Sequence, residues 1–171
     1  MRYVFFALLF MAFPAHATAT KPDTQWQGTV TYVTDGDTLW VQPTNPLIHG
    51  STPRKIRIEG IDAPESCQLY GHQSTLALKQ LIARQSVTVT TRRLDDYGRD
   101  VAKITVNNMD VGAWMVSHGH AWSYHYRHSA GPYAKQEARA RSAHRGLFAS
   151  PSPAQPSDFR RAHGSCHTPR N

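Results

Sequence analysis

The feature of this sequence that most constrains its fold is a series of short segments in which apolar and polar residues alternate. The first, Trp26–Val33, places Val30 and Tyr32 on one face and Val33 on the other. Such alternation is the pattern of a half-buried strand. After an Asp-Gly turn signal the alternation resumes over Thr38–Gln42. The N-terminal part of the chain is therefore predicted to begin with a β-hairpin.

Three later segments have the same period, namely residues 54–61, 87–90 and 101–106. Within the first of them Arg57 lies on the polar face, so it can be presented at a site without leaving its strand. Helical periodicity is found over residues 68–84, 111–117 and 132–144. This order of elements favours an α+β, mainly β fold, a five-stranded OB-type Greek-key barrel with about three α-helices.

Both ends of the chain differ from this pattern. Arg2, the apolar run 3–13 and the Ala-His-Ala sequence that ends at Ala17 have the layout of a secretory signal peptide, residues 1–17. We expect cleavage after Ala17, or after Ala19 as second choice, and a secreted or periplasmic protein; the alternative is an uncleaved anchor. Residues 150–171 contain four prolines among polar residues and are predicted to be a loosely structured tail.

Charge and cysteine content narrow the class of protein. The formal net charge is +7 and stays positive after loss of Arg2, which suits a polyanionic partner. Only two cysteines, Cys67 and Cys166, are present, so a disulfide framework and a four-thiolate zinc site are excluded. In an oxidising compartment a bridge between the two is the leading interpretation. Free thiols or a bridge to another chain stay open.

Two motifs offer oxygen ligands for a metal. Asp35-Gly36-Asp37-Thr38 by itself is most simply a hairpin turn, but Asp37 can give a carboxylate oxygen to a hard cation, with Asp35 as a supporting acid. Asp62-Ala63-Pro64-Glu65 is likewise a plausible turn, and it offers Asp62 and the Ala63 carbonyl directly after a strand. Oxygen-only ligands favour Ca²⁺ or Mg²⁺, with water and substrate phosphate completing the shell.

A third motif, Asp95-Asp96-Tyr97-Gly98-Arg99, lies between two predicted strands. A plain hairpin with a glycine bulge explains it, but Arg99 can also grip a phosphate while Tyr97 packs beside a nucleotide. Phosphodiester hydrolysis needs a metal, an activated water and cations near the phosphate oxygens. The three motifs together provide each of these, which favours a nuclease over three coincident turns.

These motifs, with the later runs Glu137–Arg141 and Gly146–Phe148, resemble the thermonuclease (staphylococcal-nuclease-like) family over about residues 26–148. The resemblance implies a nuclease domain over residues 18–149. It also implies a set of site residues: metal ligands Asp37, Asp62 and the Ala63 carbonyl; catalytic residues Arg57, Glu65 and Arg99; and substrate-binding Tyr97, Tyr124 and Tyr126.

The family's chemistry implies a role for each catalytic residue. Arg57 and Arg99 bind the scissile phosphate, and Glu65 is the general base that acts on the attacking water. Ca²⁺ is the implied cofactor, DNA and RNA are the implied substrates, and the products carry 5′-hydroxyl and 3′-phosphate ends. We expect a monomer without a stable protein partner, and alanine variants of the three catalytic residues that fold normally. Asp96 departs from the family, which often has a basic residue there.

Other features leave alternatives open. Trp122, Tyr124 and Tyr126 can stack on bases or pack in the core. Four histidines suggest either a second metal site or surface histidines: His118, His120, His125 and His128. The rival functions are a non-catalytic OB-type module that binds nucleic acid or protein, and a secreted metal-binding protein. A mere binder does not need Arg57, Glu65 and Arg99 together, which favours the nuclease.

Overall fold

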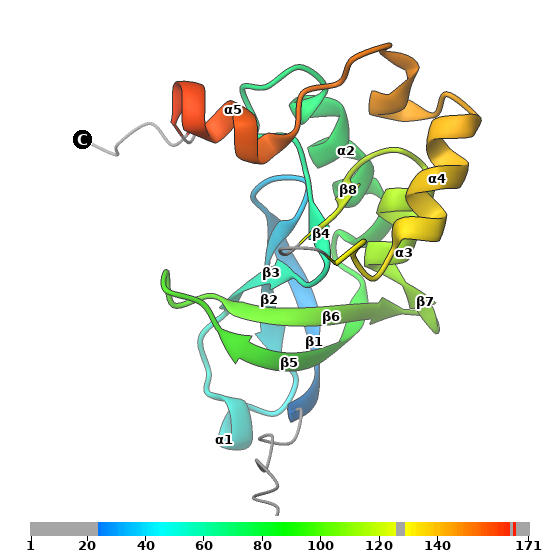
Figure 1. The fold of residues 1–171 in the computed structure, drawn as a ribbon. Helices are drawn as coiled ribbons and strands as arrows, with labels where there is room; N and C mark the ends of the chain where they lie inside the picture. Colours follow the sequence, from blue (N-terminus) through cyan, green and yellow to red (C-terminus); the bar gives the residue numbers. More distant parts are fainter. Residues whose placement is uncertain (1–23, 126–128, 165, 167–171) are drawn as a thin grey trace, which may run out of the picture.

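The computed structural model describes residues 24–125, 129–164 and 166, and Figure 1 shows their arrangement. The predicted signal peptide and Tyr126 lie outside this part. The strands are β1 (Thr24–Val33), β2 (Thr38–Pro43), β3 (Arg54–Ile58), β4 (Ile61–Asp62), β5 (Ser86–Leu94), β6 (Asp100–Val106), β7 (Met109–Asp110) and β8 (Trp122–Ser123). The helices are α1 (Pro46–His49), α2 (Gly71–Ile82), α3 (Val111–Ser117), α4 (Ala134–Ser142), the 3₁₀ helix η1 (Gly146–Ala149) and α5 (Pro156–His163).

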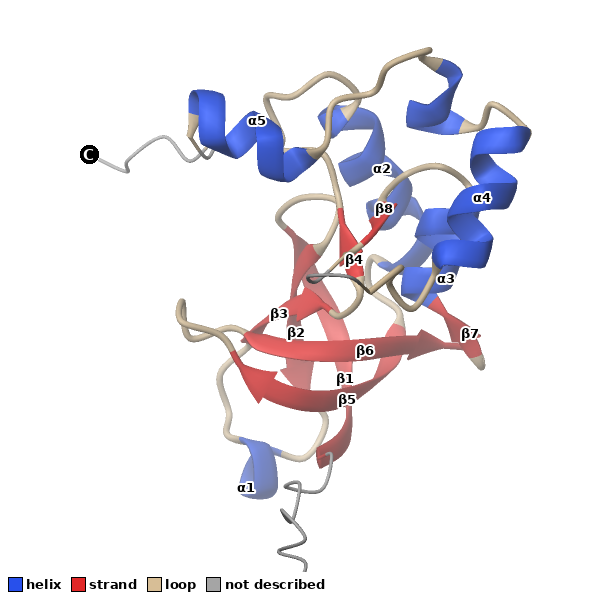
Figure 2. Ribbon diagram, viewed as in Figure 1, coloured by secondary structure: helices blue, strands red, loops and turns tan. Residues whose placement is uncertain are grey.

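Five strands close into a barrel. The sheet order is β3-β2-β1-β5-β6-β7, and a parallel pairing of β3 with β6 closes the barrel. In that pairing Ile56 lies opposite Asp100 and Arg57 opposite Val101. The strands of this sheet gather at one end of the molecule and helices α2 to α5 at the other, with β4 and β8 beside the helices (Figure 2). This arrangement confirms the α+β, OB-type barrel.

The core follows the alternation in the sequence. The inward residues of the barrel strands are buried, among them Leu39 and Val41 of β2 and Ile104 of β6. Helices α2 and α3 add Leu78 and Met115 to the same cluster. Each such side chain contributes about 1.5–3 kcal/mol by leaving water. Because the apolar face of each strand is buried, its polar face points away from the core, and one such polar face contributes to the candidate site.

The expected phase of the first strand is wrong after Val30. The register of β1 against β2 shifts between Val30 and Tyr32, which marks a β-bulge. As a result Val33 is buried and Tyr32 is 63% exposed. The bulge coincides with backbone hydrogen bonds from Val30 to the segment after α2, including Val30 N to Gln85 O at 3.0 Å. A tertiary contact thus overrides the local period.

The predicted strand over residues 54–61 is also interrupted. Strand β3 ends at Ile58, and the chain bends at Gly60, which has a φ of 77°. A Cβ there would lie 2.5 Å from the ring of Pro132, so glycine suits both the conformation and the close packing. Strand β4 then pairs with β8 in a separate two-stranded sheet. The bend turns Asp62 toward the end of the barrel that faces the helices.

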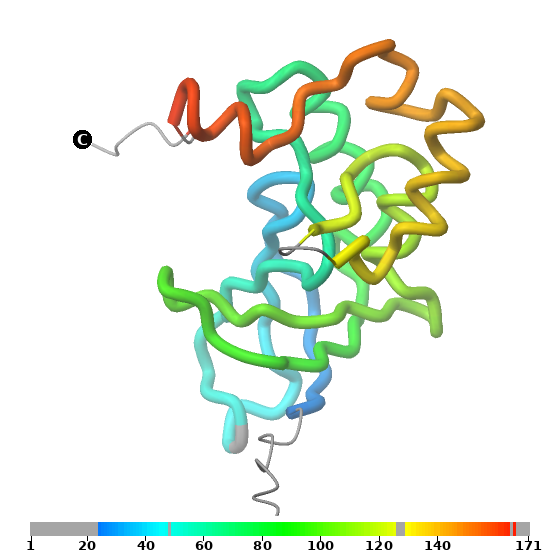
Figure 3. Tube along the Cα trace, viewed as in Figure 1, coloured from blue at the N-terminus to red at the C-terminus, as the bar shows by residue number. Residues whose placement is uncertain are grey.

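The C-terminal segment is not loosely structured over Pro156–His163, because it forms helix α5. Pro156 occupies its first turn, Asp158 is also in the first turn, and Gly164 follows its last residue, which are common start and stop signals. In Figure 3 this segment, drawn in red, lies beside the loop that precedes α2. No helix in the described part of the chain is both long and apolar enough to cross a membrane.

Candidate active site

One arginine joins two nearly buried carboxylates at the mouth of the barrel. Asp37 ends the β1–β2 turn, Arg57 lies in β3 and Asp62 ends β4. The Arg57 guanidinium lies 3.0 Å from the Asp37 carboxylate and 2.9 Å from Asp62 Oδ1. The two aspartates are only 4% and 5% exposed. The structure therefore brings together three of the residues that the sequence predicted.

Neighbouring groups hold the Asp37 carboxylate in place. Thr38 donates its hydroxyl to Oδ1 at 2.9 Å, and the Ala63 backbone N–H donates to Oδ2 at 3.1 Å. Asp35 accepts a hydrogen bond from the Asp37 N–H at 3.0 Å. A side chain at Gly36 would collide with the Ser74 hydroxyl on α2, so glycine allows the helix to pack against this turn. Hydrogen bonds to Asp37 and the packing of α2 against Gly36 thus hold the turn between β1 and β2 in place.

The pKa shifts of the carboxylates at the site reflect burial first and neighbouring negative charge second. Burial, and next the Asp37 charge, raise the pKa of Asp35 to about 7. Burial and Asp37 also raise the pKa of Asp62, against the opposing effect of Arg160 and Arg57. The charge of Asp37 is the largest cause of the raised pKa of Arg57. Carboxylates that burial makes costly to ionise are well placed to gain from a bound cation.

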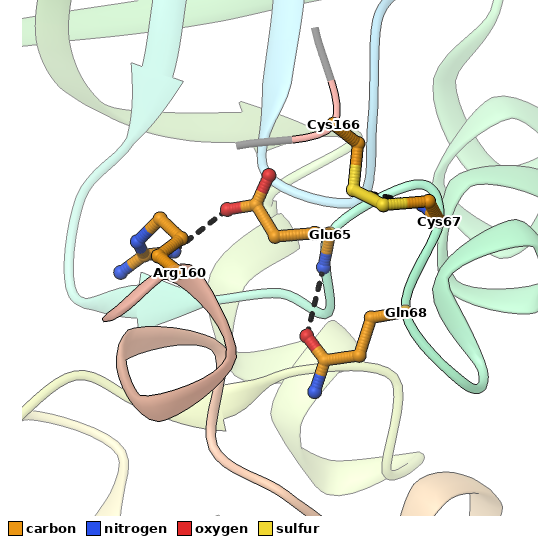
Figure 4. The surroundings of a disulfide bond; sticks show 5 residues. All are labelled: Glu65, Cys67, Gln68, Arg160 and Cys166. Atoms are coloured by element: carbon orange, nitrogen blue, oxygen red, sulfur yellow. Dashed lines mark hydrogen bonds and ion pairs between the residues drawn. A yellow bond between two sulfur atoms is a disulfide. The ribbon is translucent and has the colours of Figure 1, made fainter. Parts of the chain in front are cut away.

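Glu65 lies next to this cluster, and a residue that sequence analysis missed contacts it. The Arg160 guanidinium on α5 lies 2.8 Å from Glu65 Oε1 and 3.2 Å from Asp62 Oδ2. The Glu65 N–H donates to Gln68 Oε1 at 3.1 Å (Figure 4). The predicted bridge between Cys67 and Cys166 already placed the C-terminal segment beside the turn after Glu65, but nothing in the sequence showed that Arg160 contacts Glu65 and Asp62.

A disulfide joins Cys67 to Cys166, with Cα atoms 5.7 Å apart. Figure 4 shows it on one side of Glu65, with Arg160 on the other side. Of the arrangements that the sequence left open, the structure contains the bridge within the chain. It ties the end of the C-terminal segment to the turn that carries Glu65.

Arg99 and Tyr97 lie in the hairpin between β5 and β6, and Arg99 directly precedes Asp100, where β6 meets β3. The Arg99 side chain pairs with Asp95 at 2.8 Å and lies 5.4 Å from the Tyr97 ring. Tyr97 itself is 85% exposed. In the described part of the chain these two residues contact each other and Asp95, but not the carboxylate cluster.

The aromatic residues near β8 divide into two kinds. Trp122 is buried against Phe148, with the Arg141 guanidinium 4.5 Å from its ring, so it packs in the core. Tyr124 is 43% exposed and remains accessible to a ligand. His120 stacks on Trp114 and hydrogen bonds through Nδ1 with the Tyr70 hydroxyl at 3.1 Å. His128 lies outside the described residues.

Residues 24–125, 129–164 and 166 hold no cluster of three or more His, Cys, Asp or Glu side chains placed to bind a metal. The structure places the carboxylates of Asp37 and Asp62 at the barrel mouth, and the backbone carbonyl of Ala63 stays the predicted third oxygen donor. Such an all-oxygen set fits a hard cation that keeps water or phosphate as further ligands.

Comparison with known proteins decides the family. A family profile described as "Staphylococcal nuclease homologue" matches residues 55–150, more than half of the chain. The chain belongs to the staphylococcal nuclease family. The profile match begins at the second residue of β3, includes the turn with Glu65 and the β5–β6 hairpin, and ends before α5.

Relatives in this family differ in how much they share with the chain. An uncharacterized endonuclease of Escherichia coli O157:H7 is 35% identical over 130 residues, 75% of this chain and 81% of the relative. Micrococcal nuclease of Shigella flexneri is 32% identical over 148 residues, 80% of this chain and 82% of the relative. Probable staphylococcal-like nuclease CAN2 of Oryza sativa subsp. japonica is 42% identical over 107 residues. The match spans 63% of this chain but only 29% of that rice protein.

Proposed function

We propose that this chain is an exported, Ca²⁺-dependent endonuclease that hydrolyses DNA and RNA and leaves 3′-phosphate ends. The observation that carries the proposal is the pairing of Arg57 with two nearly buried carboxylates, Asp37 and Asp62, beside Glu65. Membership of the staphylococcal nuclease family and the similarity to an endonuclease and a micrococcal nuclease support nuclease chemistry. The signal-like residues 1–17 and the disulfide support export, because disulfides persist in oxidising compartments.

The proposed reaction assigns a task to each group. Glu65 Oε1 is bonded to Arg160, so Oε2 is the oxygen that takes a proton from the attacking water. The water oxygen bonds to phosphorus while the bond to the 5′ oxygen breaks, and that oxygen takes up a proton from solvent. Arg57 retains N–H donors beyond those bonded to Asp37 and Asp62, and these bind a phosphate oxygen. A bound Ca²⁺ supplies Lewis-acid polarisation of the phosphate.

Ca²⁺ binding at Asp37, Asp62 and the Ala63 carbonyl should be weak. Few protein ligands are available, and both carboxylates already accept hydrogen bonds from arginine. We expect a dissociation constant of about 10⁻⁴–10⁻³ M, the range of extracellular calcium modules.

Cleavage of circular plasmid and of single-stranded RNA by the purified protein, with Ca²⁺ and then with a chelator, tests the proposal. Glu65→Gln should lower the rate by about 10²–10³. The matched control is Glu59→Gln, because Glu59 is a partly exposed carboxylate at the end of β3 that pairs with Arg92 outside the cluster. New 5′-hydroxyl ends should accept labelled phosphate from polynucleotide kinase without phosphatase treatment.

A specific result would favour the alternative, a non-catalytic OB-type module. That result is oligonucleotide binding without cleavage under any divalent cation. Export is tested by the mass of the protein recovered from the periplasm or medium, which should lack residues 1–17. Recovery only in the cytoplasm with those residues attached would contradict it.

A further inference from the structure

Helix α5 brings a second guanidinium to the carboxylates at the barrel mouth. Arg160 Nη1 donates to Glu65 Oε1 at 2.8 Å, and Nη2 donates to Asp62 Oδ2 at 3.2 Å. Its side chain is 33% exposed, so these bonds form in a partly desolvated setting. Charge-assisted hydrogen bonds of this kind fix the orientation of a carboxylate. Arg160 therefore holds one candidate metal ligand and the candidate base at the same time.

The helix is attached on both sides to the turn that carries Glu65. Before the helix, Gln68 Nε2 donates to the Ala154 carbonyl at 2.8 Å. After it, the disulfide joins Cys166 to Cys67. Gln68 also accepts the hydrogen bond from the Glu65 N–H. The same short turn thus anchors both flanks of α5 and the backbone of Glu65. Figure 4 shows the disulfide and the hydrogen bond between Glu65 and Gln68.

Arg99 does not take this place in the structure. Its guanidinium is paired with Asp95 within its own hairpin. The arginines that contact the described carboxylate cluster are Arg57 and Arg160. The barrel contributes one arginine, Arg57, to these carboxylates, and the C-terminal segment contributes the second, Arg160.

We infer that Arg160 is a positioning residue for the proposed hydrolysis, and that the Cys67–Cys166 disulfide keeps it at the site. By binding Oε1, Arg160 orients the Glu65 carboxylate so that Oε2 faces the attacking water. The inference rests on the proposed function. A removable inhibitory latch would need a free flank on which the helix could swing away. Here both flanks are tied down, which favours a permanent part of the site.

The first test replaces Arg160 and compares the kinetics with those of a neighbouring arginine. Arg160→Ala should lower kcat by about 10- to 100-fold, the usual effect of losing a supporting contact, with KM changed less than about threefold. Arg160→Lys should restore part of kcat, because it keeps a cation in reach. Arg161→Ala is the control, since that side chain is 79% exposed and pairs only with Asp158 in the described structure.

A second measurement does not depend on activity. Arg160 uses both oxygens of Asp62 and adds positive charge beside the candidate cation site. Calorimetry of Arg160→Ala should therefore show Ca²⁺ binding about threefold tighter or more. Slower catalysis together with tighter Ca²⁺ binding is the signature of positioning. A merely structural role would lower Tm and would not tighten Ca²⁺ binding.

The disulfide is tested by Cys67→Ser combined with Cys166→Ser. This double variant should have a kcat between those of the wild type and Arg160→Ala. Adding Arg160→Ala to it should cause no loss beyond that of Arg160→Ala alone, because both changes act through one contact. A double variant as fast as the wild type would overturn the role given to the disulfide.

The remaining outcomes separate this inference from the proposed function. If the wild type cleaves and Arg160→Ala cleaves equally fast, the positioning role is wrong and the nuclease assignment stands. If Arg160→Ala cleaves faster, Arg160 is an inhibitory latch and the inference is overturned. If the wild type cleaves nothing under any divalent cation, the proposed function fails and the inference fails with it.

Discussion

Replacing Arg57 by alanine would test whether the paired charges at the barrel mouth stabilise the folded state in addition to serving the proposed hydrolysis. The Arg57 side chain is 20% exposed and is shared by Asp37 and Asp62. Removing one partner of a buried ion pair costs about 3–5 kcal/mol. The carboxylates keep other donors, among them Arg160 and the Thr38 hydroxyl, so the loss should lie near the low end, about 3 kcal/mol. The structure thus revises the expectation that Arg57→Ala folds normally.

Urea unfolding in the presence of a chelator measures this loss. With a slope of about 1–3 kcal/mol per molar, the midpoint should fall by about 1 M or more. Arg99→Ala is the matched control, because the Arg99 side chain is also 20% exposed and pairs with one carboxylate. Asp95 keeps the N–H groups of Tyr97 and Arg99 as donors after that change.

The loss for Arg99→Ala should therefore be smaller, about 1 kcal/mol or less. Excess Ca²⁺ should recover part of the stability of Arg57→Ala, since a cation binds the folded site and offsets the unpaired carboxylates. Equal midpoints for Arg57→Ala and the wild type in chelator would refute the view that these buried charges need their shared arginine.

Arg99→Ala should slow cleavage of a labelled oligonucleotide by about 10²–10³, and an unchanged rate would remove Arg99 from the catalytic set. Asp37→Asn should weaken Ca²⁺ binding in a calorimetric titration, with part of the activity recovered at high Ca²⁺; unaltered affinity would exclude Asp37 as a ligand. Affinity for an uncleavable oligonucleotide should fall log-linearly with salt, whereas a flat response would point to base stacking. Burial, and next His118, lower the pKa of His120. Unfolding then takes up a proton, so stability that is present above about pH 6.5 is lost as the pH falls. When the pH is lowered from about 7.5 to 5.5, Tm should fall more in the wild type than in His120→Asn. An equal fall in Tm for the two proteins would contradict the role given to His120.

The barrel could be predicted because its period is local. Alternation over β2 and β6 placed Leu39 and Ile104 inside, and both are fully buried. The same argument put Arg57 on the polar face, where it meets Asp37. Short-range motifs named residues that gather at the barrel mouth, among them Asp37, Asp62 and Glu65, because turn and strand-end positions are set by residues close in sequence.

What could not be predicted depends on contacts between distant segments. Tyr32 faces outward because of a bulge, and the bulge coincides with hydrogen bonds to the chain after α2. Arg160 was missed for a similar reason: its helix has local signals, but its position depends on the disulfide and on Gln68. Trp122 was undecided from sequence, since the packing of Phe148 against it decides the matter.

The seam between β3 and β6 also links folding to chemistry. The seam pairs Ile56 with Asp100 and Arg57 with Val101, residues far apart along the chain. Such non-local pairings form slowly, because a long stretch of chain must be ordered before they contribute stability. A chain whose barrel is still open holds Arg57 on an unpaired strand edge and lacks the wall that β6 provides. Hydrolytic activity should therefore return at the same rate as the barrel closes. The recovery of activity during refolding would then measure the rate at which β3 pairs with β6.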